Sequence, residues 1–219
     1  MIREFQPGYS RSVFLDIGAH GGLYSILLKK KNLFDEIFAF EPNPLNLAQL
    51  HSNLLINNLT DAIKIIPCAA SKADGNVGFV SCQGRHRGLS HMTDASDVKS
   101  EFTVQAVKVD SVVTYKGVFI VAKIDVEGFE ADVLEGMKDI IRDNAFLIQI
   151  EIFKERLKNV TEITEECDLN FINSIENDHF STNLLLKSSQ ICSFTEKIVW
   201  VDVFLSFDCK RQKSTGAIR

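Results

Sequence analysis

The segment formed by residues 13–22 constrains the fold of this chain more than any other part of the sequence. A mostly apolar run, Val13-Phe14-Leu15-Asp16-Ile17, is followed directly by the turn Gly18-Ala19-His20-Gly21-Gly22. Glycines permit a tight turn and let backbone N–H groups approach a ligand closely. A helix is expected over residues 21–31 and a second strand over 36–41. This order predicts a βαβ unit and therefore a mainly parallel sheet.

The rest of the chain continues to alternate apolar runs with segments of helical periodicity. Asn43 is suited to cap the next helix, with Pro44 at its first position, where the missing N–H carries no penalty. Further strands are expected at 63–68, 118–125, 146–152 and 197–207, a helix at 129–142, and two extra strands at 75–82 and 102–109. The sequence therefore predicts an α/β fold.

Length and composition indicate a single domain. The 219 residues make about one and a half common domain lengths. We expect one domain over residues 1–219, with a core at about 13–207 and a polar, basic tail at 208–219. The net charge of -5 argues against a broad nucleic-acid-binding face, so no nucleic-acid partner is expected.

Targeting features and cysteine usage predict a cytoplasmic protein. No apolar run approaches the ~18 residues of a membrane span, and residues 1–10 are too polar for a signal peptide. The five cysteines are scattered, without the close paired spacing of disulfide scaffolds or zinc sites. We interpret them as reduced thiols in a reducing compartment.

The glycine turn and its flanking acid favour a ligand that carries an amino acid. The spacing Gly-x-x-Gly-Gly differs from the GxGxxG fingerprint of dinucleotide-binding folds. A helix N-terminus alone favours an anion, but the Asp16 carboxylate can hold an ammonium group beside the ligand's carboxylate. S-adenosylmethionine carries both groups. The alternative interpretation is that Asp16 is only a turn residue.

Glu41 closes the second expected strand, where a doubly wound fold places a carboxylate beside the ribose of a bound nucleoside. A carboxylate can accept hydrogen bonds from both hydroxyls of a cis diol. The alternative is that Glu41 is a solvated strand end.

Charged residues interrupt the strand expected at 118–125, which should otherwise be apolar. Lys123, Asp125 and Glu127 alternate with apolar residues, so all three are expected to face one way. Gln149 and Glu151 repeat this pattern at the end of the following strand. Isolated buried charge costs several kcal/mol, so these groups should be paired, hydrated or ligand-facing. An ion pair between Lys123 and a neighbouring carboxylate is the structural alternative, and both interpretations can hold.

With these motifs, the chain resembles the FkbM family of methyltransferases. The resemblance covers roughly residues 13–152 and is weak beyond about residue 153. Four stretches carry it: Asp16-Ile17-Gly18-Ala19-His20-Gly21-Gly22-Leu23-Tyr24-Ser25, Phe40-Glu41-Pro42-Asn43-Pro44-Leu45-Asn46, Lys123-Ile124-Asp125-Val126-Glu127-Gly128-Phe129-Glu130 and Ile148-Gln149-Ile150-Glu151.

The resemblance implies a Rossmann-like class I methyltransferase fold, with a mostly parallel seven-stranded sheet and helices on both faces. It implies an S-adenosylmethionine-dependent O-methyltransferase that acts on a hydroxyl of a sugar, glycan or secondary metabolite. Carried over by position, Glu41 would hold the ribose and Asp125 would lie near the sulfonium. The other implied cofactor residues are Asp16, Gly18, Ala19, His20, Gly21, Gly22 and Tyr24 around the methionine part, Asn43 and Asn46 beside Glu41, and Cys68 and Ala69 at the adenine.

An alcohol is a poor nucleophile until its proton leaves, so a base is expected. The candidates are His86 and His91, in a polar loop between the two extra strands, and the carboxylates of Asp125, Glu127 and Glu151. Asp125 and Glu151 without a metal-binding motif do not predict a metal site.

Two other functional classes share part of this pattern. A nicotinamide-dependent oxidoreductase shares the order strand, glycine turn, helix, strand and acid, but the absent GxGxxG and the position of Asp16 weigh against it. A non-catalytic module could keep the nucleotide pocket without an acceptor site, and the polar strand ends argue against that. Nucleic-acid N-methylation is disfavoured because Asp125-Val126-Glu127-Gly128 stands where amino-methylating enzymes carry an Asn/Asp-Pro-Pro-aromatic motif.

Overall fold

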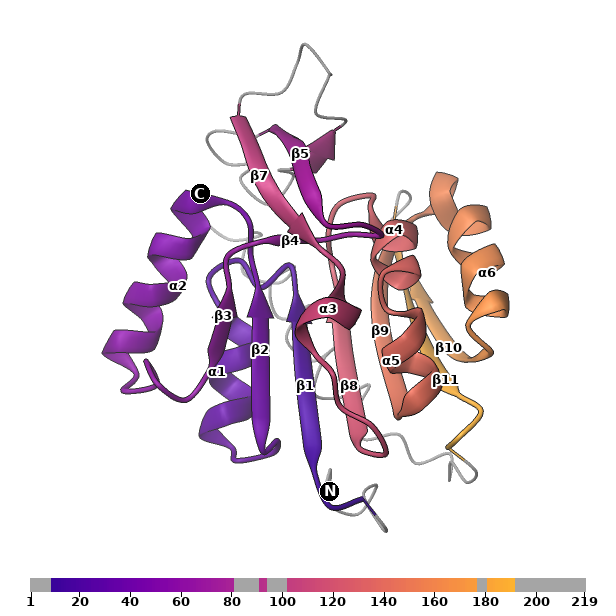
Figure 1. Cartoon of the computed structure of the whole chain (residues 1–219), viewed down its shortest axis with the longest axis horizontal. Helices are drawn as coiled ribbons and strands as arrows, with labels where there is room; N and C mark the ends of the chain where they lie inside the picture. The colour runs from indigo at the N-terminus through magenta and orange to yellow at the C-terminus, as the bar shows by residue number, and fades with distance from the viewer. Residues whose placement is uncertain (1–8, 81–90, 94–101, 177–180, 192–219) are drawn as a thin grey trace, which may run out of the picture.

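The computed structural model describes residues 9–80, 91–93, 102–176 and 181–191, and its main element is a seven-stranded sheet (Figure 1). The strand order is β10-β11-β9-β8-β1-β2-β3. The pairs β10–β11 and β11–β9 are antiparallel, and the other neighbouring strands are parallel. The strands are β1 (Ser12–Ile17), β2 (Glu36–Phe40), β3 (Lys64–Ile66), β8 (Phe119–Ile124), β9 (Ala145–Phe153), β10 (Leu169–Glu176) and β11 (Ser181–Ser188). The prediction of a mostly parallel sheet is confirmed.

Helices cover both faces of this sheet, as expected. Phe14 packs on the side of α1 (Leu23–Lys30) and α2 (Pro44–Ile56). Leu15 and Ile17 pack on the other side, with α4 (Glu130–Glu135), α5 (Lys138–Asp143) and α6 (Leu157–Glu166). Burial on both faces explains why β1 is apolar almost throughout.

A second sheet follows β3 in the chain. Its strands β4 (Ala69–Ala70), β5 (Gly75–Val80), β6 (His91–Thr93) and β7 (Phe102–Val107) have the order β4-β7-β5-β6. It stands above the arrowheads of β1 and β2, which are the carboxyl ends of the main sheet (Figure 1). The two expected extra strands are confirmed as the antiparallel pair β5–β7. The short helix α3 (Val109–Val112) then leads to β8.

The histidine loop expected between these strands is corrected in part. His91 begins β6 and pairs with Val80 of β5, because the chain returns as a third antiparallel strand. His86 lies outside the described residues.

The helix expected over 129–142 is wrong, because the structure has two helices, α4 and α5, that are separated near Gly136. The backbone of Ser71 passes so close to Gly136 that a Cβ there would lie 2.0 Å from the Ser71 carbonyl oxygen. The second helix has its own cap, since the Asp110 carboxylate accepts hydrogen bonds from the N–H groups of Asp139 and Ile140 (3.1 and 2.8 Å). A contact from a distant part of the chain therefore divides a segment of continuous helical periodicity.

The region after β9 completes the sheet with elements that the sequence did not predict. The 3-10 helix η3 (Lys154–Arg156) leads into α6, and β10 and β11 then form the edge of the sheet beside β9. The strand expected at 197–207 and the tail at 208–219 lie outside the described residues. Among the described helices, none combines the length and apolar character that crossing a membrane requires.

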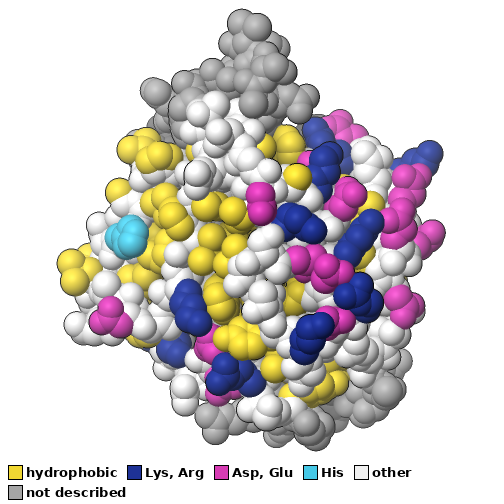
Figure 2. Space-filling view, viewed as in Figure 1, with side chains coloured by type: hydrophobic (Ala, Val, Ile, Leu, Met, Phe, Trp, Pro, Cys, Tyr) yellow, Lys and Arg dark blue, Asp and Glu magenta, His cyan; other side chains and the backbone are white. Residues whose placement is uncertain are grey.

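On the face shown in Figure 2, basic and acidic side chains are interspersed over the half of the molecule that carries α4, α5 and α6. Ion pairs that involve α4, α5 and α6 include Lys138 with Glu166 (2.7 Å) and Lys72 with Asp132 (3.3 Å). This face carries no broad basic patch among its described residues.

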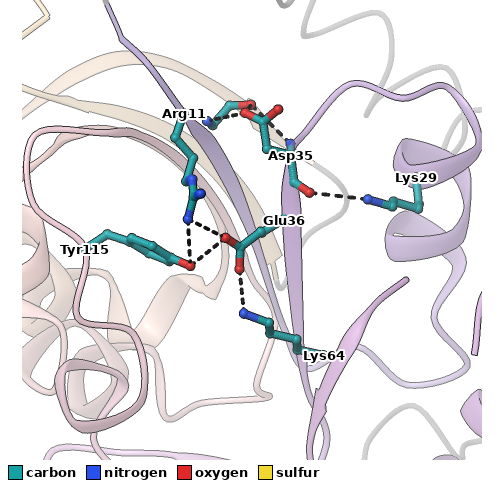
Figure 3. Close-up of polar contacts among 7 residues, drawn as sticks. Arg11, Lys29, Asp35, Glu36, Lys64 and Tyr115 are labelled. Carbon is teal, nitrogen blue, oxygen red and sulfur yellow. Dashed lines mark hydrogen bonds and ion pairs between the residues drawn. The ribbon is translucent and has the colours of Figure 1, made fainter. Parts of the chain in front are cut away.

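A polar network closes the amino end of the main sheet (Figure 3). Glu36, the first residue of β2, accepts hydrogen bonds from Arg11 (2.8 Å), Tyr115 (2.6 Å) and Lys64. Although partial burial raises the pKa of Glu36, the hydrogen bonds from Lys64 and Tyr115 outweigh it and hold that pKa below its usual value. Every oxygen of this carboxylate is thus paired.

Candidate functional site

The carboxyl end of β1 places Asp16 in the interior, with only 1% of its surface exposed. Its Oδ2 accepts hydrogen bonds from the backbone N–H (3.1 Å) and the hydroxyl (2.6 Å) of Ser25, which lies in α1. Its Oδ1 is buried and accepts no hydrogen bond from the described residues. Burial raises the pKa of Asp16, against the opposing positive charge of Lys123. Asp16 therefore anchors α1 and still has an unused acceptor.

The glycine turn after β1 is held by close packing. Gly18 has a φ of 82°, and a Cβ there would lie 1.9 Å from the carbonyl oxygen of Asp125. Gly22 has a φ of 78°, and its Cβ would lie 2.3 Å from Leu50 of α2. These glycines bring the turn against β8 on one side and α2 on the other. Gly21 is fixed through its carbonyl, which accepts a hydrogen bond from Asn53 (2.8 Å).

Glu41, directly after β2, joins two loops at the same sheet edge. Its Oε2 accepts a hydrogen bond from the N–H of His20 (2.8 Å), while Oε1 accepts one from the N–H of Asn43 (2.8 Å) and one from the amide of Asn46 (3.3 Å). The residue is 4% exposed, so the interpretation as a solvated strand end is wrong. Burial raises the pKa of Glu41 in spite of these hydrogen bonds.

Lys123 lies in the middle of a polar row that crosses the sheet. It pairs in register with Asp16 of β1 and Gln149 of β9. Its Nζ lies 2.9 Å from Asp125 Oδ2 and 5.1 Å from the centre of the Tyr24 ring. Burial by itself lowers the pKa of Lys123, but the charges of Asp125 and Asp16 outweigh it and raise that pKa. The ion pair considered from the sequence is confirmed, and so is the gathering of polar side chains at neighbouring strand ends.

The turn after β8 departs from the expected strand geometry. Because β8 ends at Ile124 and Glu127 has a φ of 54°, the prediction that Glu127 continues the alternation of Lys123 and Asp125 is wrong. Glu130 is 1% exposed; its Oε1 accepts a hydrogen bond from the N–H of Gly128 (2.7 Å), and its Oε2 has no partner among the described residues. Burial and the nearby charges of Asp125 and Glu151 raise the pKa of Glu127 to about 8.

The remaining predicted residues lie around this centre. Ala19 is buried, and its N–H donates to the Phe40 carbonyl (2.9 Å). Cys68 and Ala69 are buried just after β3, and burial raises the pKa of the Cys68 thiol. Glu151 is the register partner of Asn183 and accepts a hydrogen bond from the Ser181 hydroxyl (3.4 Å). Within the described ranges, no group of three or more His, Cys, Asp or Glu could hold a metal ion.

Sequence reasoning missed Ser25, Arg156 and the role of Glu130. A hydroxyl within an otherwise apolar first helical turn could have indicated a partner for Asp16. Glu130 could have been recognised as a first-turn acid of a helix. Arg156, whose Nη1 donates to the Gly128 carbonyl (2.7 Å), lies far along the chain and carries no local indication of this contact.

The arrangement suits a ligand with cationic and hydroxyl groups. An unused buried carboxylate oxygen favours an ammonium donor, and in open α/β sheets ligands bind outside the carboxyl ends of the strands. Asp16, Glu41 and Asp125 all lie at that edge of β1, β2 and β8.

Comparisons with known proteins agree with this geometry. The sequence model of the Methyltransferase FkbM domain matches residues 16–174. Methyltransferase sdnD of Sordaria araneosa is 34% identical over 68 residues, which cover 31% of this chain and 26% of that protein. The crystal structure of Methyltransferase FkbM from Methylobacillus flagellatus KT has a TM-score of 0.54 at 17% identity and covers 80% of this chain and 44% of its own. The chain thus spans less than half the length of either relative, and the likeness confirms the Rossmann-like methyltransferase fold.

Proposed function

The chain belongs to the FkbM methyltransferase family, and from that premise we propose that it transfers a methyl group from S-adenosylmethionine to a hydroxyl of a sugar, glycan or secondary metabolite. The observation that carries the proposal is the buried Oδ1 of Asp16, which has no hydrogen-bond partner among the described residues. An ammonium group would satisfy it and would reduce the free-energy penalty of this buried carboxylate.

The cofactor site would follow the carboxyl ends of β1, β2 and β8. Asp16, Tyr24 and the turn from Gly18 to Gly22 would hold the methionine part. Glu41 would accept from the ribose hydroxyls, since its Oε2 accepts one hydrogen bond and keeps a lone pair. Asn43 and Asn46 support Glu41, and Cys68 and Ala69 would flank the adenine beyond β3.

Methyl transfer to oxygen is an in-line displacement at carbon, so the protein mainly aligns the reactants and excludes water. Bound S-adenosylmethionine supplies an activated methyl group on a positive sulfur. Alignment alone can contribute up to ~7–11 kcal/mol. The Asp125 backbone packs against Gly18, and the ion pair with Lys123 holds the Asp125 carboxylate at the end of β8, where it would face that positive charge. A base is also needed, and Asp125, Glu127, Glu151, His86 and His91 are the candidates predicted from the sequence.

The same charges argue against a phosphodiester acceptor. Asp125, Glu130 and Glu151 all act on Glu127 around the end of β8, and these carboxyl groups would repel a polyanion there. We therefore propose a neutral, hydroxyl-bearing acceptor rather than a nucleic acid.

Calorimetric titration of the full chain with S-adenosylmethionine and, separately, with NAD tests the cofactor. We expect binding of the first and none of the second. Tight NAD binding with no S-adenosylmethionine binding would favour an oxidoreductase.

Incubation with tritium-labelled S-adenosylmethionine and a pool of glycans or metabolites tests the reaction. A folded protein that binds the cofactor but labels nothing in these pools would favour a non-catalytic module.

A further inference from the structure

The turn that follows β8 holds a glutamate in a conformation that glutamate rarely adopts. Glu127 has a φ of 54°, in the left-handed region, and Gly128 follows with a φ of 105°. Such backbone conformations cost about 1–3 kcal/mol and tend to persist where the surrounding structure fixes them. Residues of two other elements contact this turn, so contacts outside the turn determine its backbone conformation.

Those contacts come from α4 and from η3. The Gly128 N–H donates to Glu130 Oε1 (2.7 Å), and the Gly128 carbonyl accepts from Arg156 Nη1 (2.7 Å). A Cβ on Gly128 would lie 3.1 Å from the Arg156 guanidinium carbon, so the contact is tight. The turn is therefore held on both sides, and Glu127 is kept close after the end of β8 at Ile124.

Among the described residues, the charges that act most strongly on Glu127 are mostly negative. Asp125 at the end of β8, Glu130 of α4 and Glu151 of β9 all raise its pKa, while Lys123 lowers it. Two described cations near this turn have other partners, because Lys123 pairs with Asp125 and Arg156 donates to the Gly128 carbonyl. Burial makes the largest contribution, and together with these charges it raises the pKa of Glu127 to about 8. A proton bound to Glu127 is thus retained at neutral pH.

Two buried carboxylate oxygens at this edge indicate that a cationic ligand completes the site. Asp16 Oδ1 and Glu130 Oε2 each belong to residues that are 1% exposed, and neither has a hydrogen-bond partner among the described residues. Asp125 couples electrostatically to both residues, so they border one charge cluster from β1 and α4. Placing a positive group there would favour the charged form of every carboxylate in the cluster.

We propose that Glu127 is the proton-accepting residue of this site, and that it is converted to its carboxylate form when the positive sulfur of the cofactor binds. This inference rests on the proposed function. In the reaction the acceptor O–H proton passes to the Glu127 carboxylate, and the oxygen's electron pair forms the new O–CH3 bond. The S–CH3 bond breaks, and its electrons remain on sulfur, which becomes neutral. Charge balances, because one carboxylate and one sulfonium become one carboxylic acid and one thioether.

Proton release on binding tests this without any acceptor. The full chain is titrated with S-adenosylmethionine and with S-adenosylhomocysteine at pH 7.5 by calorimetry, in phosphate and in Tris, whose ionisation enthalpies differ. We expect the sulfonium compound to release roughly 0.5 proton more than the thioether, because most Glu127 is protonated at this pH. E127Q should lose this excess, while E155Q, which alters an exposed glutamate of η3, should keep it.

The outcomes separate the two proposals. If both compounds bind and the excess is absent, or persists unchanged in E127Q, the assignment of Glu127 is wrong. If neither compound binds the folded wild-type chain, the proposed function is wrong, and the assignment of Glu127, which depends on it, is wrong as well. Labelled methyl transfer gives a second readout: E127Q should transfer at least ~100-fold more slowly than wild type, and an unchanged rate would overturn the proton-accepting role.

Should E127Q fail to fold, E127N replaces it in the calorimetric test, because asparagine tolerates the left-handed backbone conformation. The wild-type chain also gives an independent measurement. A carboxyl resonance in a 13C-glutamate-labelled sample should titrate near pH 8 and move to lower pH with S-adenosylmethionine. No glutamate titrating above pH 6 would contradict the proposal.

Discussion

The two ends of the main sheet carry polar networks of opposite character. At the amino end, Glu36 is surrounded by donors that are themselves largely exposed, with Arg11 at 48% and Lys64 at 58% side-chain exposure. At the carboxyl end, Asp16 and Glu130 are almost fully buried, and each has a carboxylate oxygen without a partner among the described residues. The same strands β1 and β2 connect these two ends.

The difference in pKa direction follows from the difference in pairing. Glu36 has a lowered pKa because its donors outweigh partial burial, so its charge stabilises the fold. Asp16, Glu41 and Glu127 have raised pKa values because burial outweighs their partners. Perturbed and incompletely paired groups of this kind concentrate at functional sites. This contrast is consistent with a structural closure at the amino end and supports the ligand site proposed for the carboxyl end.

The largest expected effect is on stability, from removal of the central cation. Lys123→Met leaves Asp125 without its ion-pair partner and Asp16 without the opposing charge, so the free energy of unfolding should fall by about 3 kcal/mol at pH 7. The loss should shrink at pH 5, where protonation of Asp16 becomes easier. Urea denaturation measures both values. Lys64→Met, at the exposed amino end, is the matched control and should cost less than ~1 kcal/mol; equal losses for the two variants would contradict the comparison.

Glu41→Ala should weaken S-adenosylmethionine binding more than tenfold, or at least ~1.4 kcal/mol. It should also lower stability by about 1–3 kcal/mol, because the N–H groups of His20 and Asn43 lose their acceptor. Calorimetric titration of the folded variant gives the affinity. Glu36→Ala makes the same change at the other end of β2 and should leave the affinity unchanged. Unaltered binding by the Glu41 variant would remove the ribose assignment.

Glu127→Gln should raise stability. The folded chain holds a proton on Glu127 up to a pKa of about 8, whereas the unfolded chain releases it near the ordinary value of 4.5. Wild-type stability therefore falls as the pH rises between these values, and glutamine avoids that loss. The gain should grow from pH 5 to pH 8 and reach roughly 1–2 kcal/mol after allowance for solvent screening. Thermal unfolding at the two pH values measures it, and a gain that does not depend on pH would refute the assignment.

The smallest effect should come from Glu36→Gln. A lowered pKa contributes stability above the unfolded value of 4.5 and loses it as the pH falls through the folded pKa. The variant should therefore lose at most ~1 kcal/mol at pH 7, and progressively less as the pH falls below 4.5. Urea denaturation across this pH range tests it. A larger loss would mean that the amino-end network is more strongly coupled than its exposure implies.

Local patterns were enough to predict the parallel part of the sheet. The apolar runs of β1, β2, β8 and β9 lie where they were expected, because strands buried on both faces must be apolar throughout. The departures have non-local causes. Ser71 and Asp110 separate α4 from α5, and nothing within residues 129–142 indicates either contact. The strands β10 and β11 carry mixed polar and apolar residues, which made their assignment ambiguous.

By itself, the sequence determined that carboxylates stand at the ends of neighbouring strands around a glycine turn, because strand periodicity and the order of elements are local properties. Only the tertiary structure decided which of them are paired. Asp125 pairs with Lys123, Glu41 holds two loops together, and Asp16 and Glu130 each keep a buried oxygen without a partner in the described part of the chain. Hydrogen-bond satisfaction depends on groups that meet only when distant segments pack, so no pattern along the chain could assign it.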